Sequence, residues 1–145
     1  MKVVIQRVNS ASVTVNNEVV SKINNGLLVL VGLHTDDTEE KFDYFINKIL
    51  NLRIFSDNAG VMNKSILDFG GEILLVSQFT LYADCKKGNR PSYMHAMPPK
   101  DAGMLYANFV TKFREKYSKV FDGKFGAYMK VALENDGPVT IILEQ

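Results

Sequence analysis

The stretch MKVVIQRVNSASVTVNNEVVSKINNGLLVLVGL, residues 1–33, decides the fold. Side chains alternate over residues 3–8 and again over 13–15, a pattern typical of strands. Asparagine and glycine at 16–17 and 24–26 are turn residues, and they would separate hairpin strands. Residues 27–33 are apolar except for Gly32, which indicates a buried strand. The chain is therefore expected to open as a sheet.

Downstream of this stretch the spacing of apolar residues predicts two helices. Asp37 can cap the first, with Glu40 three positions later in the capping-box arrangement. The second helix follows Pro98-Pro99. The apolar residues that recur at helical spacing are Phe42, Phe45, Ile46, Ile49 and Leu50 in the first helix, and Ala102, Leu105, Tyr106, Phe109, Val110, Phe113 and Tyr117 in the second.

Further strands are expected at 52–55, 73–81, 127–133 and 139–143. A turn at 56–60 closes the first of them, Gly70-Gly71 forms a hairpin turn, and 135–138 joins the last two. Two helices with many antiparallel strands predict an α+β fold. We expect one domain over residues 1–145, with a curved, largely antiparallel, barrel-like sheet.

Composition indicates a soluble globular protein. Of the 145 residues 46% are hydrophobic and 23% charged, ordinary values for such chains. The longest apolar run is far too short to span a bilayer, and the amino terminus lacks the apolar core of a secretory signal. A lone cysteine, Cys85, cannot form an internal disulfide. We expect a cytoplasmic protein without a membrane partner.

The charge distribution is uneven, although the net charge is only +1. Residues 86–130 hold ten Lys or Arg against three acids, an excess of seven positive charges. Such asymmetry favours a polyanionic ligand. The alternative is that most of these lysines simply solvate one helix face.

The usual catalytic sets are missing. His34 and His95 could each act as a base, but a structural or surface role is favoured. Neighbouring Lys86 and Lys87 could lower the pKa of Cys85, yet no partner is identifiable, which favours a passive thiol. No metal-ligand spacing occurs, so we expect neither a metal nor a cofactor.

Two segments stand out instead. Residues 77–81, SQFTL, place polar side chains where a buried strand should remain apolar, which costs free energy unless they are paired or used. An edge strand with one solvated face would also explain them. Residues 135–140, NDGPVT, match a plain β-turn, because Asp-Gly is a standard turn pair.

Together the two segments resemble the paired motifs SQxTL and NxGPxT of the D-aminoacyl-tRNA deacylase family. The opening residues 1–8 and the loop 87–92, KGNRPS, are similar to the family as well. Tyr93 stands where phenylalanine is commoner. Length, motif order and motif positions agree over essentially the whole chain.

The resemblance implies a homodimer with active sites at the subunit interface. Gly137 and Pro138 would form a cis pair that reaches into the partner's site. There their carbonyl groups exclude an L side chain and accept a D side chain or glycine. Arg7 resembles the arginine that braces this loop, although an exposed strand-end arginine remains the alternative. Asn135 and Thr140 belong to the same motif and would contribute to substrate binding.

The resemblance also assigns the first motif to an ester hydrolase acting on aminoacyl-tRNA. Ser77 and Gln78 would line the catalytic pocket, with a main-chain N–H near Gln78 as oxyanion donor. Phe79 would contact the terminal adenine. Thr80 lacks an evident base, so we expect it to position the substrate while the 2′-OH of the terminal ribose helps to activate water.

Two other functions remain open at the level of sequence. One is a noncatalytic nucleic-acid-binding module, suggested by the basic stretch and the missing acid–base residues. The other is a Thr80-dependent esterase for small molecules. The family resemblance favours the deacylase with aminoacyl-tRNA as its partner, and no DNA partner is expected.

Overall fold

A computed structural model describes residues 1–145. The main sheet contains β1 (Lys2–Val15), β2 (Glu18–Ile23), β3 (Gly26–Gly32), β6 (Glu72–Ser77), β7 (Val120–Asp122) and β8 (Lys130–Glu144). A small second sheet contains β4 (Phe55–Ser56) and β5 (Met62–Lys64). The helices are α1 (Phe42–Asn51), α2 (Ile66–Phe69) and α3 (Pro99–Lys116), with 3₁₀ turns η1 (Glu39–Lys41) and η2 (Phe79–Tyr82). None of the helices combines the length and the apolarity that a bilayer crossing requires.

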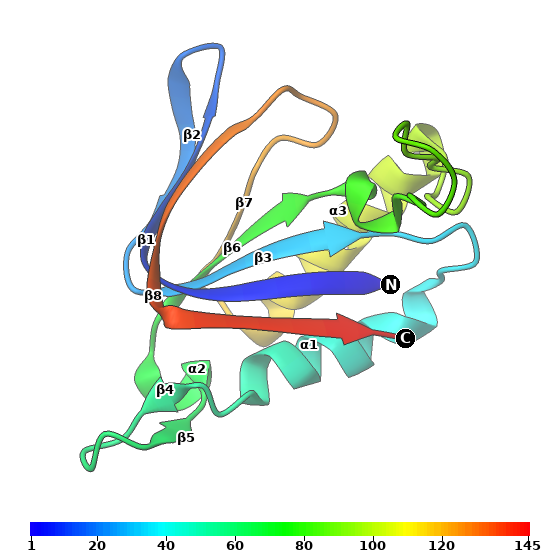
Figure 1. The fold of residues 1–145 in the computed structure, drawn as a ribbon. Helices are drawn as coiled ribbons and strands as arrows, with labels where there is room; N and C mark the ends of the chain where they lie inside the picture. The colour runs from blue at the N-terminus through cyan, green and yellow to red at the C-terminus, as the bar shows by residue number, and fades with distance from the viewer.

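The long strand β1 organises the main sheet. On one side it pairs with β3 through its first half and with β2 through its second half. Along its other side it pairs with β8 almost from end to end. The strand order is β2-β1-β3-β6-β7, with β8 beside β1, and the sheet curves into a nearly closed barrel (Figure 1). The predicted α+β class and barrel-like sheet are therefore confirmed.

The sheet is mixed, so the prediction of a largely antiparallel sheet needs correction. The β3–β6 and β6–β7 pairs are parallel. Parallel neighbours need a long crossover, and α1 and α3 lie in these two connections. The central strands are consequently buried on both faces, which explains the continuous apolar run in β3.

Two apolar clusters fill the two faces of the sheet. The larger lies between the sheet and the helices, and the smaller lies on the concave face. Alternate residues of β3 divide between them: Leu27 and Val29 belong to the first and Leu28 to the second. Phe42 of α1 meets Phe109 of α3 edge-to-face, with ring centroids 5.2 Å apart. Such a pair adds about 0.5–1.5 kcal/mol beyond the burial of its area.

Asp37 does not cap the first helix, contrary to the sequence-based expectation. Its buried carboxylate accepts hydrogen bonds from the Met1 ammonium at 2.6 Å, from Lys41 Nζ at 2.9 Å and from the His34 N–H at 2.6 Å. Burial by itself raises the pKa of Asp37, but these donors more than offset it and the pKa is lowered. Helix α1 starts after η1 without a side-chain cap.

A short helix, α2, replaces the predicted hairpin turn at Gly70-Gly71. Ser65 and Asp68 cap its start: Ser65 Oγ accepts from the Asp68 N–H at 3.2 Å, and the Asp68 carboxylate accepts from the Ser65 N–H at 2.9 Å. Gly70 ends the helix in the left-handed region at φ +74°. The strand expected at 52–55 is likewise reduced to the two-residue β4, which begins only at Phe55.

Candidate active site

The polar segment SQFTL leaves the sheet and does not continue the strand. Strand β6 ends at Ser77, and Phe79–Tyr82 form the 3₁₀ turn η2, so the strand predicted to extend to residue 81 is wrong. The reason is the end of its neighbour, because β3 stops at Gly32 and offers no further ladder. The Gln78 N–H makes the closing bond to the Val31 carbonyl at 2.7 Å.

Gly32 allows the turn to fold back closely. A Cβ at this position would lie 3.0 Å from Leu81 Cβ and 3.1 Å from the Gln78 carbonyl oxygen. These separations are tight enough that a larger residue would push η2 away from the end of β3. Because Gly32 has no side chain, the turn η2 can pack closely against the end of β3.

Within the turn, Gln78 and Thr80 are joined. The Gln78 side-chain amide donates a short hydrogen bond to the Thr80 hydroxyl oxygen. No carboxylate, imidazole or amine is hydrogen-bonded to Thr80, so nothing in this chain activates it as a nucleophile. The Thr80 hydroxyl proton remains available for donation.

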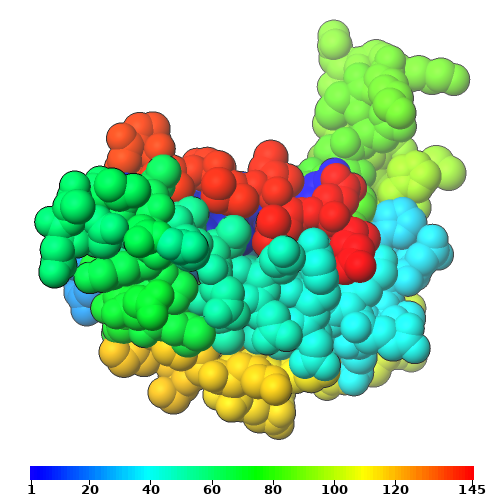
Figure 2. All heavy atoms as spheres, turned by 90° about the horizontal axis from the view of Figure 1, so that it is seen from below, coloured from blue at the N-terminus to red at the C-terminus, as the bar shows by residue number.

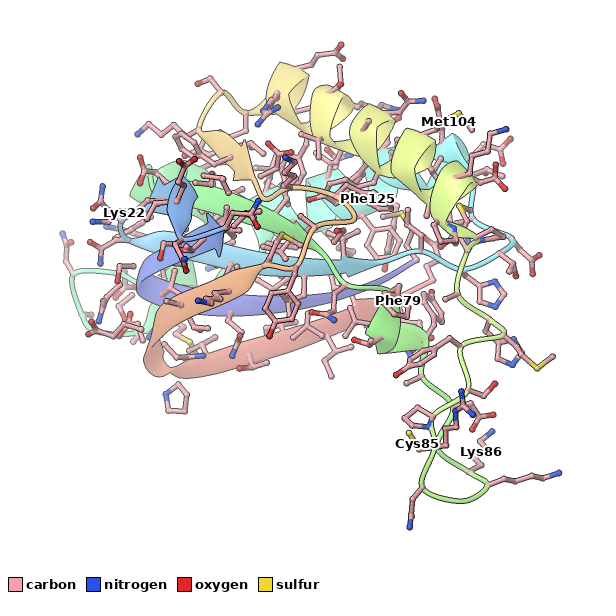
Figure 3. All side chains as sticks on the ribbon, turned by 90° about the horizontal axis from the view of Figure 1, so that it is seen from above. Lys22, Phe79, Cys85, Lys86, Met104 and Phe125 are labelled. Atoms are coloured by element: carbon pink, nitrogen blue, oxygen red, sulfur yellow. The ribbon has the colours of Figure 1, made fainter.

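Ser77, Gln78 and Phe79 line a cavity of about 610 Å³, within the range of small-molecule sites. Its other walls come from the chain before α3, the start of α3 and residues 125–131. Phe79 is 57% exposed at the cavity, and its ring meets Tyr93 edge-to-face at 5.0 Å. Figure 3 shows Phe79 and Phe125 on the same side of the molecule.

The composition of the cavity wall limits its chemistry. Fourteen of the nineteen lining residues are hydrophobic, and the wall contains no Asp, Glu, His, Lys, Arg or Cys. The nineteen are Val31, Leu33, Val76, Ser77, Gln78, Phe79, Tyr93, Ala96, Met97, Pro98, Pro99, Ala102, Tyr106, Phe125, Gly126, Ala127, Tyr128, Met129 and Val131. Tyrosines apart, the cavity wall therefore offers no general base.

Several wall residues carry no functional signal in the sequence. Ala102 and Tyr106 belong to the apolar stripe of α3, which indicates only core packing. Residues 127–129 are predicted to lie in a strand, although β8 begins at Lys130. Tyr128 is 87% exposed while lining the cavity. Aromatic residues around the glycine in the stretch FGAYM, 125–129, are the signal that could have found this wall.

Tyr106 has a buried hydroxyl without a hydrogen-bond partner. The residue is 3% exposed, and its ring lies 5.7 Å from that of Phe125. Burial raises the pKa of Tyr106 above its ordinary range, with a smaller contribution from Asp122. The phenol is therefore neutral and does not serve as a base at physiological pH.

The remaining candidate bases lie outside the cavity wall. The His34 ring stacks on the His95 ring with centroids 5.8 Å apart, and His34 Nδ1 accepts the Asp36 N–H at 3.2 Å. Cys85 is an exposed free thiol. None of the three lines the cavity.

The second polar segment is an interruption within one strand. Both halves of β8 pair with β1, so residues 135–138 do not reverse the chain as a turn between two strands would. Val8 pairs with Asn135 and Gln6 pairs with Thr140, which leaves Arg7 alone opposite residues 136–139. Gly137 has φ +124°, and the Gly137–Pro138 peptide bond is cis.

Arg7 connects this interruption to the rest of the chain. Its side chain lies 2.9 Å from the Asp136 carboxylate and donates to the Asp136 carbonyl at 3.3 Å. It also donates to the Ile54 carbonyl at 2.5 Å, and the residue is only 9% exposed. Asn135 Oδ1 accepts from the Val139 N–H at 3.1 Å and so closes the loop from within. The Thr140 hydroxyl makes only a long contact with the side-chain amide of Gln6, in addition to the backbone pairing of the two residues.

The structure does not bring the two segments together within one chain. Gly137 and Pro138 are exposed at the bend of β8, at the opposite end of the sheet from η2 (Figure 1). No residue beyond 131 lines the cavity. One chain therefore presents a concave cavity and, separately, an outward bend of β8 at residues 136–139, which we call the convex corner.

Comparisons with known proteins identify the family of the chain. The family profile described as D-Tyr-tRNA(Tyr) deacylase matches residues 4–144. The D-aminoacyl-tRNA deacylase of Thermosipho melanesiensis is 59% identical over 145 residues, covering 99% of this chain and 97% of that protein. That of Brevibacillus brevis is 56% identical and covers 99% of both.

Two solved structures are similar over almost their entire lengths. One, described as c-Myc DNA Unwinding Element Binding Protein, has a TM-score of 0.95 and 48% identity, and covers 100% of this chain and 99% of that one. The other, described as a probable eukaryotic D-amino acid tRNA deacylase, has a TM-score of 0.83 at 20% identity, covers 98% and 97%, and supports the fold alone.

The structure is thus a small α+β domain with a cavity at the end of a parallel strand. The chain belongs to the D-Tyr-tRNA(Tyr) deacylase family. The predicted family and the predicted class of enzyme, a hydrolase of the aminoacyl-tRNA ester, are confirmed by this membership.

Proposed function

We propose that this chain hydrolyses the ester between tRNA and a D-amino acid or glycine, as a homodimer that rejects L-aminoacyl-tRNA. The observation that carries the mechanism is the cavity wall, which presents Ser77 and Gln78 at the end of β6 and, tyrosines apart, no acid–base side chain. Hydrolysis in such a wall needs an activating group from elsewhere. The neighbouring 2′-OH of the substrate's terminal ribose supplies it, so the catalysis is RNA-assisted.

The turn provides the donors for the developing negative charge. The Gln78 N–H is already bonded to Val31, so it is not the oxyanion donor. The N–H groups of Phe79 and Thr80 begin η2, where the first turn of a helix has no intrahelical acceptor. We assign the oxyanion to these two groups, with Ser77 beside them and Phe79 against the terminal adenine. Donors of this type contribute about 3–4 kcal/mol each to transition-state stabilisation.

Gln78 and Thr80 orient the bound ester. Because Thr80 accepts from the Gln78 amide, its own proton points to a different acceptor, and the substrate supplies one. This geometry favours positioning over covalent catalysis.

Chiral selection requires the convex corner of a second chain. Gly137 and Pro138 are exposed and do not line the cavity of their own chain, and Arg7 holds the preceding residue, Asp136. Strand β8 is paired on one side only and exposes Ile142 at 65% and Leu133 at 40%. An exposed edge with apolar side chains favours association. In the proposed dimer the carbonyl groups of the partner's Gly137 and Pro138 stand where an L side chain would go.

The experiment is a comparison of D-Tyr-tRNA, L-Tyr-tRNA and glycyl-tRNA with the purified protein. We expect rapid release of D-Tyr and glycine and slow release of L-Tyr. A substrate with a 2′-deoxy terminal ribose should be inert. Equal rates for the D and L substrates would contradict the proposal, and full activity on the deoxy substrate would contradict RNA assistance.

The alternatives give different results in the same experiment. A noncatalytic nucleic-acid-binding module would bind RNA in a salt-sensitive manner without cleaving the ester. A Thr80 esterase would lose all turnover on Thr80→Ala substitution and would yield a trapped acyl-enzyme. The solved structure with 48% identity is described as c-Myc DNA Unwinding Element Binding Protein. A DNA-binding role for this chain would show no dependence on a ribose 2′-OH.

A further inference from the structure

A basic loop, residues 84–92, stands away from the body of the protein. Its base is fixed by two backbone hydrogen bonds between Asp84 and Ser92, of 2.7 Å and 2.9 Å. The Lys86 N–H donates to the Asp84 carboxylate at 2.9 Å, and Gly88 turns the tip at φ +67°. Figure 2 shows this segment projecting beyond the surface, and Figure 3 shows Cys85 and Lys86 on it.

The cations of this loop are free, whereas several others of the basic stretch are paired. Lys86, Lys87 and Arg90 are exposed, and none takes part in an ion pair. By contrast, Lys112 pairs with Asp43 at 2.7 Å and Arg114 with Asp122 at 2.6 Å. The three cations of this loop are therefore available to bind an anionic ligand.

In the sequence the loop also lies between two residues of the cavity wall, Phe79 and Tyr93. It follows η2, which carries Phe79, and it is followed by Tyr93. Both aromatic rings line the cavity, contact each other and are partly exposed. A group inserted in the cavity would thus continue past this aromatic pair and along the loop. Aromatic rings beside a row of cations are the usual combination for single-stranded nucleic acid.

We propose that the basic loop binds the single-stranded 3′ end of the RNA, with Lys86, Lys87 and Arg90 on the phosphates that precede the terminal nucleotide. Tyr93 provides a stacking surface beside Phe79 for the next base. The inference rests on the proposed function, because it assumes that the terminal nucleotide enters the cavity. The single strand is favoured over the duplex because the free cations lie next to the cavity, within reach of the nucleotides joined directly to the terminal one.

The test is a ladder of substrates: D-Tyr-adenosine, the D-Tyr ester of the trinucleotide pCpCpA, and D-Tyr-tRNA. The variant is Lys86→Gln/Lys87→Gln/Arg90→Gln. Its matched control is Lys22→Gln/Lys48→Gln/Lys64→Gln, which removes the same charge from β2, α1 and β5. Lys22 lies at the far end of the molecule from the loop (Figure 3).

We expect wild-type kcat/KM to rise from the adenosine ester to the trinucleotide. In the loop variant the ratio of kcat/KM on the trinucleotide to kcat/KM on the adenosine ester should fall about 10- to 100-fold. Whole tRNA should show no further loss. On the trinucleotide, the slope of log kcat/KM against log salt concentration should become shallower by about 2. The reason is that three phosphate contacts are lost and each contributes about 0.7 to the slope. The control variant should match wild type on all three substrates.

An unchanged ratio in the loop variant would overturn the proposal. A loss confined to whole tRNA would also overturn it, because the cations would then bind the duplex, and so would an equal loss in the control variant. The proposed function fails separately: it is contradicted if the wild-type protein does not prefer the D enantiomer of the adenosine ester, whatever the loop variant does.

Discussion

The two polar interruptions, at the end of β6 and in the middle of β8, have opposite shapes. The first turns inward, and its residues line a cavity within their own chain. The second turns outward and exposes Gly137 and Pro138, while Arg7 holds Asp136 and Asn135 holds Val139 on either side of them. A concave site can be complete as a binding pocket, whereas a convex corner needs a surface to act upon. One chain alone does not bring the two interruptions together, so in the proposed function the chemistry and the selectivity reside in different places.

The largest effect is expected for Arg7→Ala, which removes the support of the convex corner. The substitution leaves the carbonyls of Ile54 and Asp136 and a half-exposed carboxylate without their donor. The free energy of unfolding should fall by about 2–3 kcal/mol, measured by urea denaturation. The ratio of D to L kcat/KM should fall as well.

Arg7→Lys should be measured beside Arg7→Ala. Lysine keeps the charge but lacks the planar group that donates to the Ile54 and Asp136 carbonyls at once. It should recover part of the stability and less of the selectivity. Full selectivity in Arg7→Ala, despite lost stability, would show that the corner does not depend on this brace.

Gly137→Ala should affect the corner more locally. A Cβ at Gly137 would lie 2.8 Å from Val139 Cγ2 and 3.1 Å from Arg7 Nη2, at a φ of +124°. The strain should cost about 1–3 kcal/mol and displace the carbonyl groups, so that L-Tyr-tRNA becomes a substrate while D-Tyr-tRNA is still cleaved. The measurement is the D to L ratio.

Gly60→Ala is the matched control, because Gly60 also has a positive φ, +78°, but its Cβ would meet open space. It should lose some stability and keep its selectivity. If both glycine variants lose selectivity equally, the corner has no special role.

Thr80→Ala, in the turn beside the cavity, should lower kcat/KM only modestly. Gln78 loses its acceptor, but no activated nucleophile is removed, so kcat/KM should stay within about tenfold of wild type. Thr80→Ser should match wild type. Abolished turnover, or an acyl-enzyme detected by mass spectrometry, would make Thr80 the nucleophile instead.

The smallest effect is expected for Tyr106→Phe. The hydroxyl is buried, unpaired and inaccessible, so its removal should leave kcat/KM unchanged and the free energy of unfolding unchanged or higher by up to about 1 kcal/mol. A raised KM would indicate that the cavity wall opens and that this hydroxyl reaches the substrate.

Local patterns predict much of the fold. Alternation indicates β1, the apolar run indicates β3, and helical spacing indicates α1 and α3. Parallel pairing is not predictable in this way because strand direction depends on where the helical crossovers return the chain. The end of β6 escapes prediction for a similar reason: Ser77 ends it because β3 ends at Gly32, 45 residues earlier in the sequence.

The site is predictable only in part. Both motifs are contiguous in sequence, so the family resemblance marks Ser77, Gln78, Gly137 and Pro138 as candidates, although their residue types alone also fit an edge strand and a β-turn. The partners that define their setting come from distant segments, such as Ile54 against Arg7 and the stretch 125–129 across the cavity. Tyr106 looks like an ordinary core residue in the sequence because nothing local marks a hydroxyl that lacks a partner.

The central claim, that selectivity is donated across a dimer, is tested most directly with a purified heterodimer. One chain carries Ser77→Tyr, which fills its cavity, and the other carries Gly137→Ala; two different affinity tags isolate the mixed species. We expect one working site, formed by the intact cavity of the second chain and the intact corner of the first. The heterodimer should therefore show about half of the wild-type rate on D-Tyr-tRNA and full rejection of L-Tyr-tRNA. A heterodimer that cleaves L-Tyr-tRNA as the Gly137→Ala homodimer does would show that each corner acts on its own chain, and would contradict the account.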